Sequence, residues 1–436
     1  MQGSGDPARD PPSGTERRKG ADFALYPPRA RKGLDPLRLD DFTARLDAFR
    51  RRVEELRDPR GESALHLLDL DLIRRRFGRR FGELRENIFQ IVEHALDRAL
   101  GAQDLYVVVD ETTIYALTCG WPREEARLRL RLAAAHITER LCGVVPGGAA
   151  IRVTSLAFPF DRELRGVAGL AALRARVEAF LARARKQEEE AFRLHADRLR
   201  PRLEPLIQPR KGLIGAYLLD GWHEREDGRL EPAVCLCPDR FEGAFDAALD
   251  TWRAERLAER LADWRRVAGR SLLVVPVHFD TLARRRDREP YLQRLRRLPQ
   301  HSARVVVFEL LDAPPGVPQG YLHQLLMYLK PFALALAVRL APLALSTEAF
   351  AQSGVRFVSM PAKAPRGEEP RALVQRLART AREAGMRSAL VEVEETGWIT
   401  AARDSGVDHL AGPLIAPPLP QPLPRGRRAL WARTCG

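Results

Sequence analysis

The sequence predicts an α/β protein in which a C-terminal TIM-barrel-like domain is joined by a long helix to a smaller α+β domain. After Pro209, strand-like and helix-like segments alternate over about 210 residues, which is typical of a parallel sheet with crossover helices and most economically of a barrel. Before it, residues 162–200 carry apolar side chains at helical spacing, and residues 36–160 mix both periodicities.

The N-terminal part begins with residues 1–35, which are rich in Pro, Gly, Arg and Asp and predict a disordered arm. A short helix is expected from about Leu37 to Leu56, where Asp58-Pro59 ends it. Within the domain assigned to residues 36–160, the pattern further predicts a hairpin, a helix and a strand, over residues 105–117, 122–142 and 150–158.

Residues 63–100 allow two interpretations. Apolar side chains from Leu65 to Leu100 recur every three to five residues, which fits one or two helices. The alternative is that this segment starts with a strand.

The linker assigned to residues 161–204 is predicted to be one long helix. Its apolar positions between Val167 and Leu194 alternate steps of three and four, as in a heptad repeat. The helix is therefore expected either to pack on its own domain or to form a parallel coiled coil that makes the protein a homodimer.

The C-terminal half, residues 205–424, is expected to form the barrel, followed by a tail at 425–436. Strands are predicted at 213–219, 272–277, 305–310, 333–338, 356–360 and 389–393. Helices are predicted at 241–268, 281–298, 319–330, 346–352 and 368–385.

Charge and composition exclude several classes of protein. The net charge is +14, with 72 basic and 58 acidic residues, but the surplus is spread along the chain, so nucleic-acid binding is not favoured. The longest apolar stretch, 331–345, is too short for a membrane span and contains Arg339. Five cysteines, including the isolated Cys235 and Cys237 pair, make neither a disulfide scaffold nor a zinc motif, and a cytoplasmic location is expected.

Four segments of the C-terminal half resemble, in order and spacing, the EAL domain, the barrel-shaped cyclic di-GMP phosphodiesterase. They are Gln208-Pro209, Val307–Leu310, Ala381–Thr396 and Gly406–Ile415. The resemblance implies a barrel that hydrolyses a phosphodiester with two divalent cations held by oxygen ligands.

The departures from that family bear on its chemistry. The glutamate that names the family would fall at Tyr217, a following asparagine ligand at Pro276, and the terminal glutamine at Ala411. The paired aspartates should lie within 331–347, yet no acid occurs from Ala313 to Thr347. The lysine expected near residue 360 is also missing. Because most metal ligands are lost, we expect no catalytic residues, no metal and no cofactor.

Three acidic residues remain at positions that match the family. They are Glu309, Glu392 and Glu395, and they are the candidate ligand-binding residues of this chain. An ordinary role as strand-end ion-pair partners of nearby arginines is the alternative for all three.

The preceding half loosely resembles a GGDEF domain, the diguanylate cyclase fold that often precedes an EAL domain. Asp69-Leu70-Asp71, Asp104 and Val108–Thr112 carry the likeness. It implies that residues 63–100 hold the first strand and helix of that fold. Valines replace the two glycines that let the hairpin approach a triphosphate, so cyclase chemistry is not expected.

These observations predict a catalytically inactive, degenerate EAL-like protein, a pseudo-enzyme of bacterial cyclic di-GMP signal transduction. It would act by binding a partner protein or a nucleotide, with cyclic di-GMP as a possible ligand. Two alternatives stay open, namely an active cyclic di-GMP phosphodiesterase with a rebuilt metal site and a basic nucleic-acid-binding protein.

Overall fold

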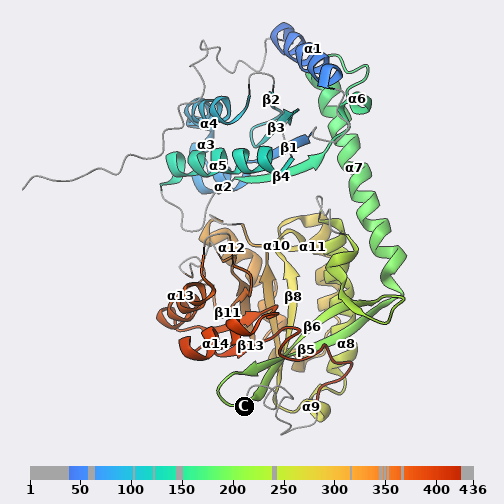
Figure 1. The fold of residues 1–436 in the computed structure, drawn as a ribbon, viewed down its shortest axis with the longest axis vertical. Helices are drawn as coiled ribbons and strands as arrows, with labels where there is room; N and C mark the ends of the chain where they lie inside the picture. The colour runs from blue at the N-terminus through green and yellow to red at the C-terminus, as the bar shows by residue number, and fades with distance from the viewer. Residues whose placement is uncertain are drawn as a thin grey trace, which may run out of the picture. The chain divides into compact units, whose positions relative to one another are not determined.

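The predicted fold class is confirmed by the computed structural model of the chain (Figure 1). The structure describes residues 39–56, 64–101, 104–120, 123–143, 151–237, 243–314, 317–342, 347, 350, 353–364 and 368–423. The predicted arm 1–35, the tail 425–436 and most of the predicted helix 346–352 lie outside the described residues.

The N-terminal domain is built on an antiparallel sheet of four strands in the order β2-β3-β1-β4. The strands are β1 (Ala64–Asp69), β2 (Leu105–Val108), β3 (Thr113–Thr118) and β4 (Arg152–Ala157). The hairpin β2–β3 confirms the prediction. The Asp110 carboxylate closes its turn by accepting hydrogen bonds from the amides of Thr112 and Thr113 at 2.8 and 2.9 Å.

Helices cover both faces of this sheet. They are α1 (Leu39–Leu56), α2 (Asp71–Phe77), α3 (Arg80–Glu83), α4 (Arg85–Ala99), α5 (Arg123–Cys142), α6 (Phe160–Glu163) and α7 (Gly169–Ala196). Because side chains alternate along a strand, Leu68 packs in the core that includes α4 and α5, whereas Leu65 packs in the core that includes α1 and α7.

The helical interpretation of residues 63–70 is wrong, because residues 64–69 form the central strand β1. The strand pairs on both sides, with β3 and with β4. Its buried His66 contacts the hydroxyls of Ser155 and Thr118 at 2.7 and 2.9 Å, one on each neighbouring strand. The apolar spacing of Leu65 to Leu68 fits a short strand as well as a helix, and tertiary pairing decides between them.

The long helix α7 begins at Gly169 rather than at residue 162. Gly166 and Gly169 both have positive φ, so the backbone turns here before the helix starts. Leu173 and Val177 of its apolar seam are fully buried in the core that α7 shares with the N-terminal sheet. This part of the seam therefore packs within the chain, and the homodimer stays a prediction.

The C-terminal half is a closed barrel of eight strands. In spatial order they are β5 (Leu199–Gln208), β13 (His409–Leu410), β12 (Arg387–Val391), β11 (Val355–Pro361), β10 (Ala335–Arg339), β9 (Val306–Leu311), β8 (Leu272–His278) and β6 (Leu213–Glu224). Pairing of β5 with β6 closes the ring, and β5 runs antiparallel to both of its neighbours. Residues 199–204 were predicted to belong to the linker helix, and this prediction is wrong, because α7 ends at Ala196 and these residues begin β5. Pro201 and Pro205 disfavour a strand, so the sequence did not predict β5.

Shorter elements and helices surround the barrel. They are β7 (Leu230–Pro232), η1 (Ala233–Leu236), α8 (Ala244–Leu261), α9 (Trp264–Val267), α10 (Phe279–Ala283), α11 (Arg285–Leu295), η2 (Gln300–Arg304), α12 (Gln319–Met327), η3 (Lys330–Phe332), α13 (Pro370–Glu383) and α14 (Thr396–Ser405). No helix among the described residues has the length and apolar character needed to cross a membrane.

Alternation along the barrel strands separates an outer from an inner layer. Leu273, Val275 and Val277 of β8 face the helices. A separate small cluster fills the interior and consists of Leu206, Ala216, Leu218, Val391 and Ala411. The same alternation decides which polar side chains can reach the barrel mouth, the end of the barrel formed by the carboxyl ends of its parallel strands.

Candidate functional site at the barrel mouth

Four polar side chains meet inside the barrel mouth. Glu309 is on β9, Arg339 ends β10, Ser359 is on β11 and Glu392 directly follows β12. In the sheet register, Glu309 lies beside Ala337, and Arg339 lies beside Ser359. The four side chains therefore come from four adjacent strands and face the same interior. We call them the Arg339 cluster.

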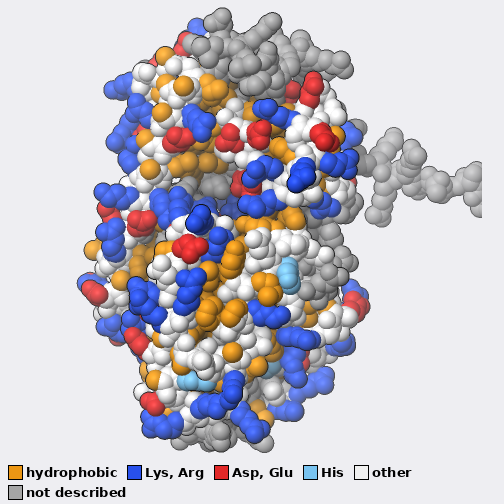
Figure 2. All heavy atoms as spheres, turned by 180° about the vertical axis from the view of Figure 1, so that it is seen from behind, with side chains coloured by type: hydrophobic (Ala, Val, Ile, Leu, Met, Phe, Trp, Pro, Cys, Tyr) orange, Lys and Arg blue, Asp and Glu red, His pale blue; other side chains and the backbone are white. Residues whose placement is uncertain are grey.

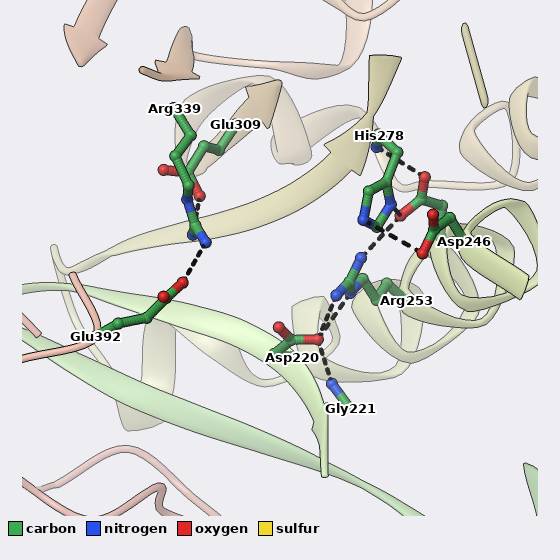
Figure 3. Close-up of polar contacts among 9 residues, drawn as sticks. Asp220, Gly221, Asp246, Arg253, His278, Glu309, Arg339 and Glu392 are labelled. Carbon is green, nitrogen blue, oxygen red and sulfur yellow. Dashed lines mark hydrogen bonds and ion pairs between the residues drawn. The ribbon is translucent and has the colours of Figure 1, made fainter. Parts of the chain in front are cut away.

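Arg339 holds this cluster together (Figure 3). Its Nη2 donates to Glu309 Oε2 at 2.8 Å, and its Nη1 donates to Glu392 Oε1 at 3.0 Å. The Ser359 hydroxyl donates to the other oxygen of Glu309. A guanidinium presents its donors in a planar fork, so one arginine can bind two carboxylates at the same time.

The cluster is buried at one end and open at the other. The Glu309 side chain is 4% exposed, that of Arg339 is 19% exposed and that of Glu392 is 59% exposed. Burial alone would lower the pKa of Arg339, but the carboxylates of Glu309 and Glu392 outweigh it and raise that pKa. Arg339 is therefore a permanent cation at the mouth.

Glu392 reaches Arg339 from a strained backbone. Its φ is +59°, in the left-handed region that non-glycine residues rarely adopt. Nearby, Gly412 has a φ of +142°, and a Cβ there would stand 2.1 Å from the backbone nitrogen of Val393. The chain after β12 is thus packed tightly against the segment after β13, and this packing holds Glu392 in place.

Two further acidic side chains, Glu204 and Asp220, interact electrostatically with the Arg339 cluster. Burial, followed by the charge of Asp220, raises the pKa of Glu204 on β5 to about 8, while Arg339 acts in the opposite direction. Glu204 is therefore largely protonated at neutral pH. The interior holds more acidic groups than Arg339 alone can neutralise.

Asp220 connects the mouth to a buried network behind it (Figure 3). Its Oδ1 accepts hydrogen bonds from Nε and Nη2 of Arg253 at 2.8 and 2.6 Å. Arg253, which is on α8, also donates to Asp250 at 2.8 Å. Asp250 in turn accepts from the amide and ring of His278 at 2.8 and 3.0 Å and from Thr281 at 2.6 Å. Each of these charges has a partner, so the network joins α8 to β6 and β8.

The three predicted site residues have different positions. Glu309 and Glu392 are brought together by Arg339. Glu395 is exposed at the start of α14, and within the described part of the chain no hydrogen bond or ion pair joins it to the Arg339 cluster. Glu395 is therefore not assigned to the site.

Tyr217 does not line the mouth, contrary to the expectation from the family alignment. Its ring packs edge-on against Trp264 at 5.8 Å, and its hydroxyl accepts a hydrogen bond from the Leu423 amide at 3.0 Å. The side chains of β6 that face the interior are Ala216 and Leu218. Matching by motif alone ignored the alternation of side chains along a strand.

The residues at the mouth do not fit a pair of divalent cations. The carboxylates of Glu309 and Glu392 already bind a guanidinium, and Pro276, which lies beside Glu309 in the register, offers no donor oxygen. Throughout the described ranges, no group of three or more His, Cys, Asp or Glu side chains is placed to hold a metal ion.

Sequence reasoning did not identify Arg339 as a site residue. The signal was present, because Arg339 is the only charged residue between Pro331 and Thr347. A single charge at the end of an apolar strand requires a buried partner or a site. Glu204 was missed for another reason, namely that its strand was not predicted.

Comparison with known proteins supports this fold. No protein-family model matches the chain, and no curated protein matches it. Among solved structures, the S helix–GGDEF–EAL portion of Vibrio cholerae LapD bound to c-di-GMP matches with a TM-score of 0.54 and 10% identity, over 87% of this chain and 94% of that chain.

Two further structures that carry an EAL domain match part of the chain. That of Xanthomonas citri FimX in complex with c-diGMP is 15% identical over 58% of this chain and all of its own, with a TM-score of 0.40. An EAL domain protein from Listeria monocytogenes is 11% identical over 53% of this chain and 92% of its own, with a TM-score of 0.42. At 10% identity, the match to LapD establishes a likeness of fold.

Proposed function

We propose that this chain is a catalytically inactive EAL-type protein of cyclic di-GMP signalling, which binds the nucleotide at the barrel mouth without metal and passes its state to a partner protein. The observation that carries the proposal is the position of Arg339 between Glu309 and Glu392. The fold likeness to LapD, whose structure is described as bound to c-di-GMP, supports the class of ligand and a GGDEF-like identity for residues 36–160.

The guanidinium supports inactivity for a chemical reason. Metal-assisted hydrolysis requires a cation that lowers the pKa of a bound water and produces hydroxide. Arginine has no vacant coordination position for water and stays protonated, so it balances the charge of the carboxylates without supplying the nucleophile. The substitution would thus keep the fold of the mouth and remove its chemistry.

The same guanidinium supports binding of an anion. Arg339 is partly exposed, and its bond to Glu392 is on the open side of the cluster. A phosphate could replace the Glu392 carboxylate and form a two-pronged contact with Arg339. When the phosphate replaces the Glu392 carboxylate, Glu392 loses its ion pair with Arg339. That ion pair is the contact which its left-handed backbone conformation positions.

Calorimetry on the full chain tests the proposal. Cyclic di-GMP is expected to bind equally well with Mg²⁺ and with EDTA, and its hydrolysis is expected to be undetectable at high protein concentration. Arg339→Lys keeps the charge but removes the fork, so we expect at least a tenfold loss of affinity, and no loss for the exposed Arg387→Lys.

The possible outcomes separate the alternatives. Turnover with Mg²⁺ or Mn²⁺ would overturn inactivity and favour a phosphodiesterase with a rebuilt site. Absence of binding would overturn the nucleotide-receptor function. Steeply salt-dependent binding of DNA or RNA in place of cyclic di-GMP would favour the nucleic-acid alternative. In Figure 2, basic side chains are distributed over most of the face drawn, between acidic and apolar ones, which does not single out such a surface.

A further inference from the structure

Two histidines meet at the junction between the long helix and the barrel, outside the Arg339 cluster. His195 lies in the last turn of α7, and His223 lies near the end of β6. Their ring centres are 5.4 Å apart, and the ring planes are nearly perpendicular, at 85°. Neither residue belongs to the proposed nucleotide site.

The buried nitrogens of these rings lack protein partners. His223 is only 9% exposed, and neither its Nδ1 nor its Nε2 has a hydrogen-bond partner among the described residues. Nδ1 of His195 is also buried without one. Burial of an unsatisfied polar group costs about 1–3 kcal/mol, and native proteins rarely leave such groups without a ligand or a partner.

The surroundings of the two rings are mainly apolar. The side chains packed at this end of α8 and β5 form an apolar cluster that contains Leu199, Phe245 and Trp252. Burial, then the neighbouring His223 and Arg198, lowers the pKa of His195. His195 is therefore in its neutral form at physiological pH, which is the form that binds metals.

We propose that His195 and His223 together bind a transition-metal ion of the zinc class. Imidazole nitrogen suits Zn²⁺, Ni²⁺ and Cu²⁺ but not the hard cations Mg²⁺ and Ca²⁺. Two imidazoles that share a tetrahedral zinc at a Zn–N distance of about 2.1 Å hold their ring centres about 5 to 5.5 Å apart. The observed separation of 5.4 Å lies in this range.

The secondary structure makes this pair a defined site. The backbone of His223 is fixed on both sides, by Leu199 of β5 and Glu231 of β7. His195 is only four residues before β5 begins, at the end of a 28-residue helix. A metal held by both would fasten the end of α7 to the barrel wall. With two protein ligands, the site would be weaker than a four-ligand structural zinc site and would keep positions for water or another ligand.

The experiment uses the full chain carrying Cys235→Ser and Cys237→Ser, so that nearby thiolates cannot bind the added zinc. Calorimetry with zinc chloride is expected to show one bound ion per chain, and zinc is expected to raise the melting temperature. His223→Ala and His195→Ala should each lower the affinity at least about tenfold, because each removes one of two ligands. His94→Ala, at an exposed position on α4, is the matched control and should bind as the parent does.

Three results would overturn the proposal. They are absence of zinc binding in the Cys-to-Ser background, unchanged affinity in the His195→Ala variant, and loss of binding in His94→Ala. Because His195 is partly exposed, its replacement serves as the test if His223→Ala does not fold. Lowering the pH below about 6 is expected to release the ion as the imidazoles become protonated.

Discussion

At the scale of single residues, the barrel mouth depends on one arginine. Arg339 binds Glu309, which is almost fully buried, and Glu392, which is held in a left-handed backbone conformation. A buried acidic group must be paired or protonated, and Glu309 is paired with the guanidinium of Arg339. Arg339 is thus a residue that the stability of the barrel requires.

Replacement of Arg339 by methionine is expected to destabilise the barrel by roughly 3 kcal/mol, because it leaves the Glu309 carboxylate buried without its partner. Adding Glu309→Gln to this variant should restore part of the loss, since the uncompensated charge is then gone. Chemical denaturation of the single and double variants measures both effects.

Arg387→Met is the control for this comparison. Arg387 is also a β-strand arginine with an acidic neighbour, Asp408 at 3.7 Å, but its side chain is 63% exposed. Exposed ion pairs contribute little, so a change within about 0.5 kcal/mol is expected. If Arg339→Met and Arg387→Met lowered the free energy of unfolding equally, burial of the Arg339 cluster would not be the cause of the loss.

Sequence comparison predicted part of this site at the level of residues. Glu309 and Glu392 were identified because they match acidic positions of the EAL family, Glu309 within an apolar strand and Glu392 directly after one. Tyr217 was assigned wrongly, because a motif fixes a position in the chain but not the face of the sheet, and a shift of one residue reverses the side chain. The ion pairs of Arg339 join residues 30 and 53 positions apart, and no local pattern encodes such distances.

At the scale of elements, local periodicity predicted the secondary structure of segments that pack on one face. It failed for segments whose conformation is decided by pairing with other strands. The hairpin β2–β3 and six of the barrel strands (β6, β8, β9, β10, β11 and β12) were predicted from short apolar runs between turns. β1 was ambiguous, because its apolar residues fit a helix until the two strands that flank it are known. β5 was missed because of its prolines, although it closes the barrel and carries Glu204.

Glu204 makes the stability of the barrel depend on pH. Its pKa is about 8 in the folded chain against an ordinary value of 4.5, so the folded state holds a proton that the unfolded state releases. The free energy of unfolding should therefore fall as pH rises from about 5 to 8, by at most about 1.4 kcal/mol per pH unit. Glu204→Gln removes this pH-dependent contribution. The stability of the variant relative to wild type should therefore be higher at pH 8.5 than at pH 5.

Denaturant unfolding at the two pH values provides the measurement. Glu224→Gln, at an exposed position of the neighbouring strand β6, is the matched control and should follow the wild-type pH dependence. If Glu204→Gln and wild type differed by the same amount at pH 5 and pH 8.5, Glu204 would not be the group that holds the proton.

At the scale of the whole molecule, α7 takes part in both halves. Its first half is buried with the N-terminal sheet through Leu173 and Val177. Its second half contacts α8 and continues, after two residues, into β5 of the barrel. The heptad spacing allowed packing on the helix's own domain or a coiled coil, and at these positions it is used for packing within the chain.

Glu188 of α7 is the polar link in this arrangement. α8 follows Gly243, which has no side chain to cap the helix, and the buried Glu188 carboxylate accepts hydrogen bonds from the Ala244 and Phe245 amides at 2.8 and 3.3 Å. A carboxylate at a helix N-terminus satisfies free amides and interacts favourably with the helix dipole. A residue 56 positions earlier in the chain thereby acts as the cap of α8.

Glu188→Ala is therefore expected to cost about 1–2 kcal/mol and to raise hydrogen exchange at the first turn of α8. Glu188→Gln keeps an acceptor oxygen and loses the charge, so its loss should be smaller than that of alanine. Glu190→Ala, two residues away on the exposed side of α7, should leave the exchange of α8 unchanged. If exchange rose only within α7 itself, Glu188 would serve its own helix, and the long helix would not be fastened to the barrel at this point.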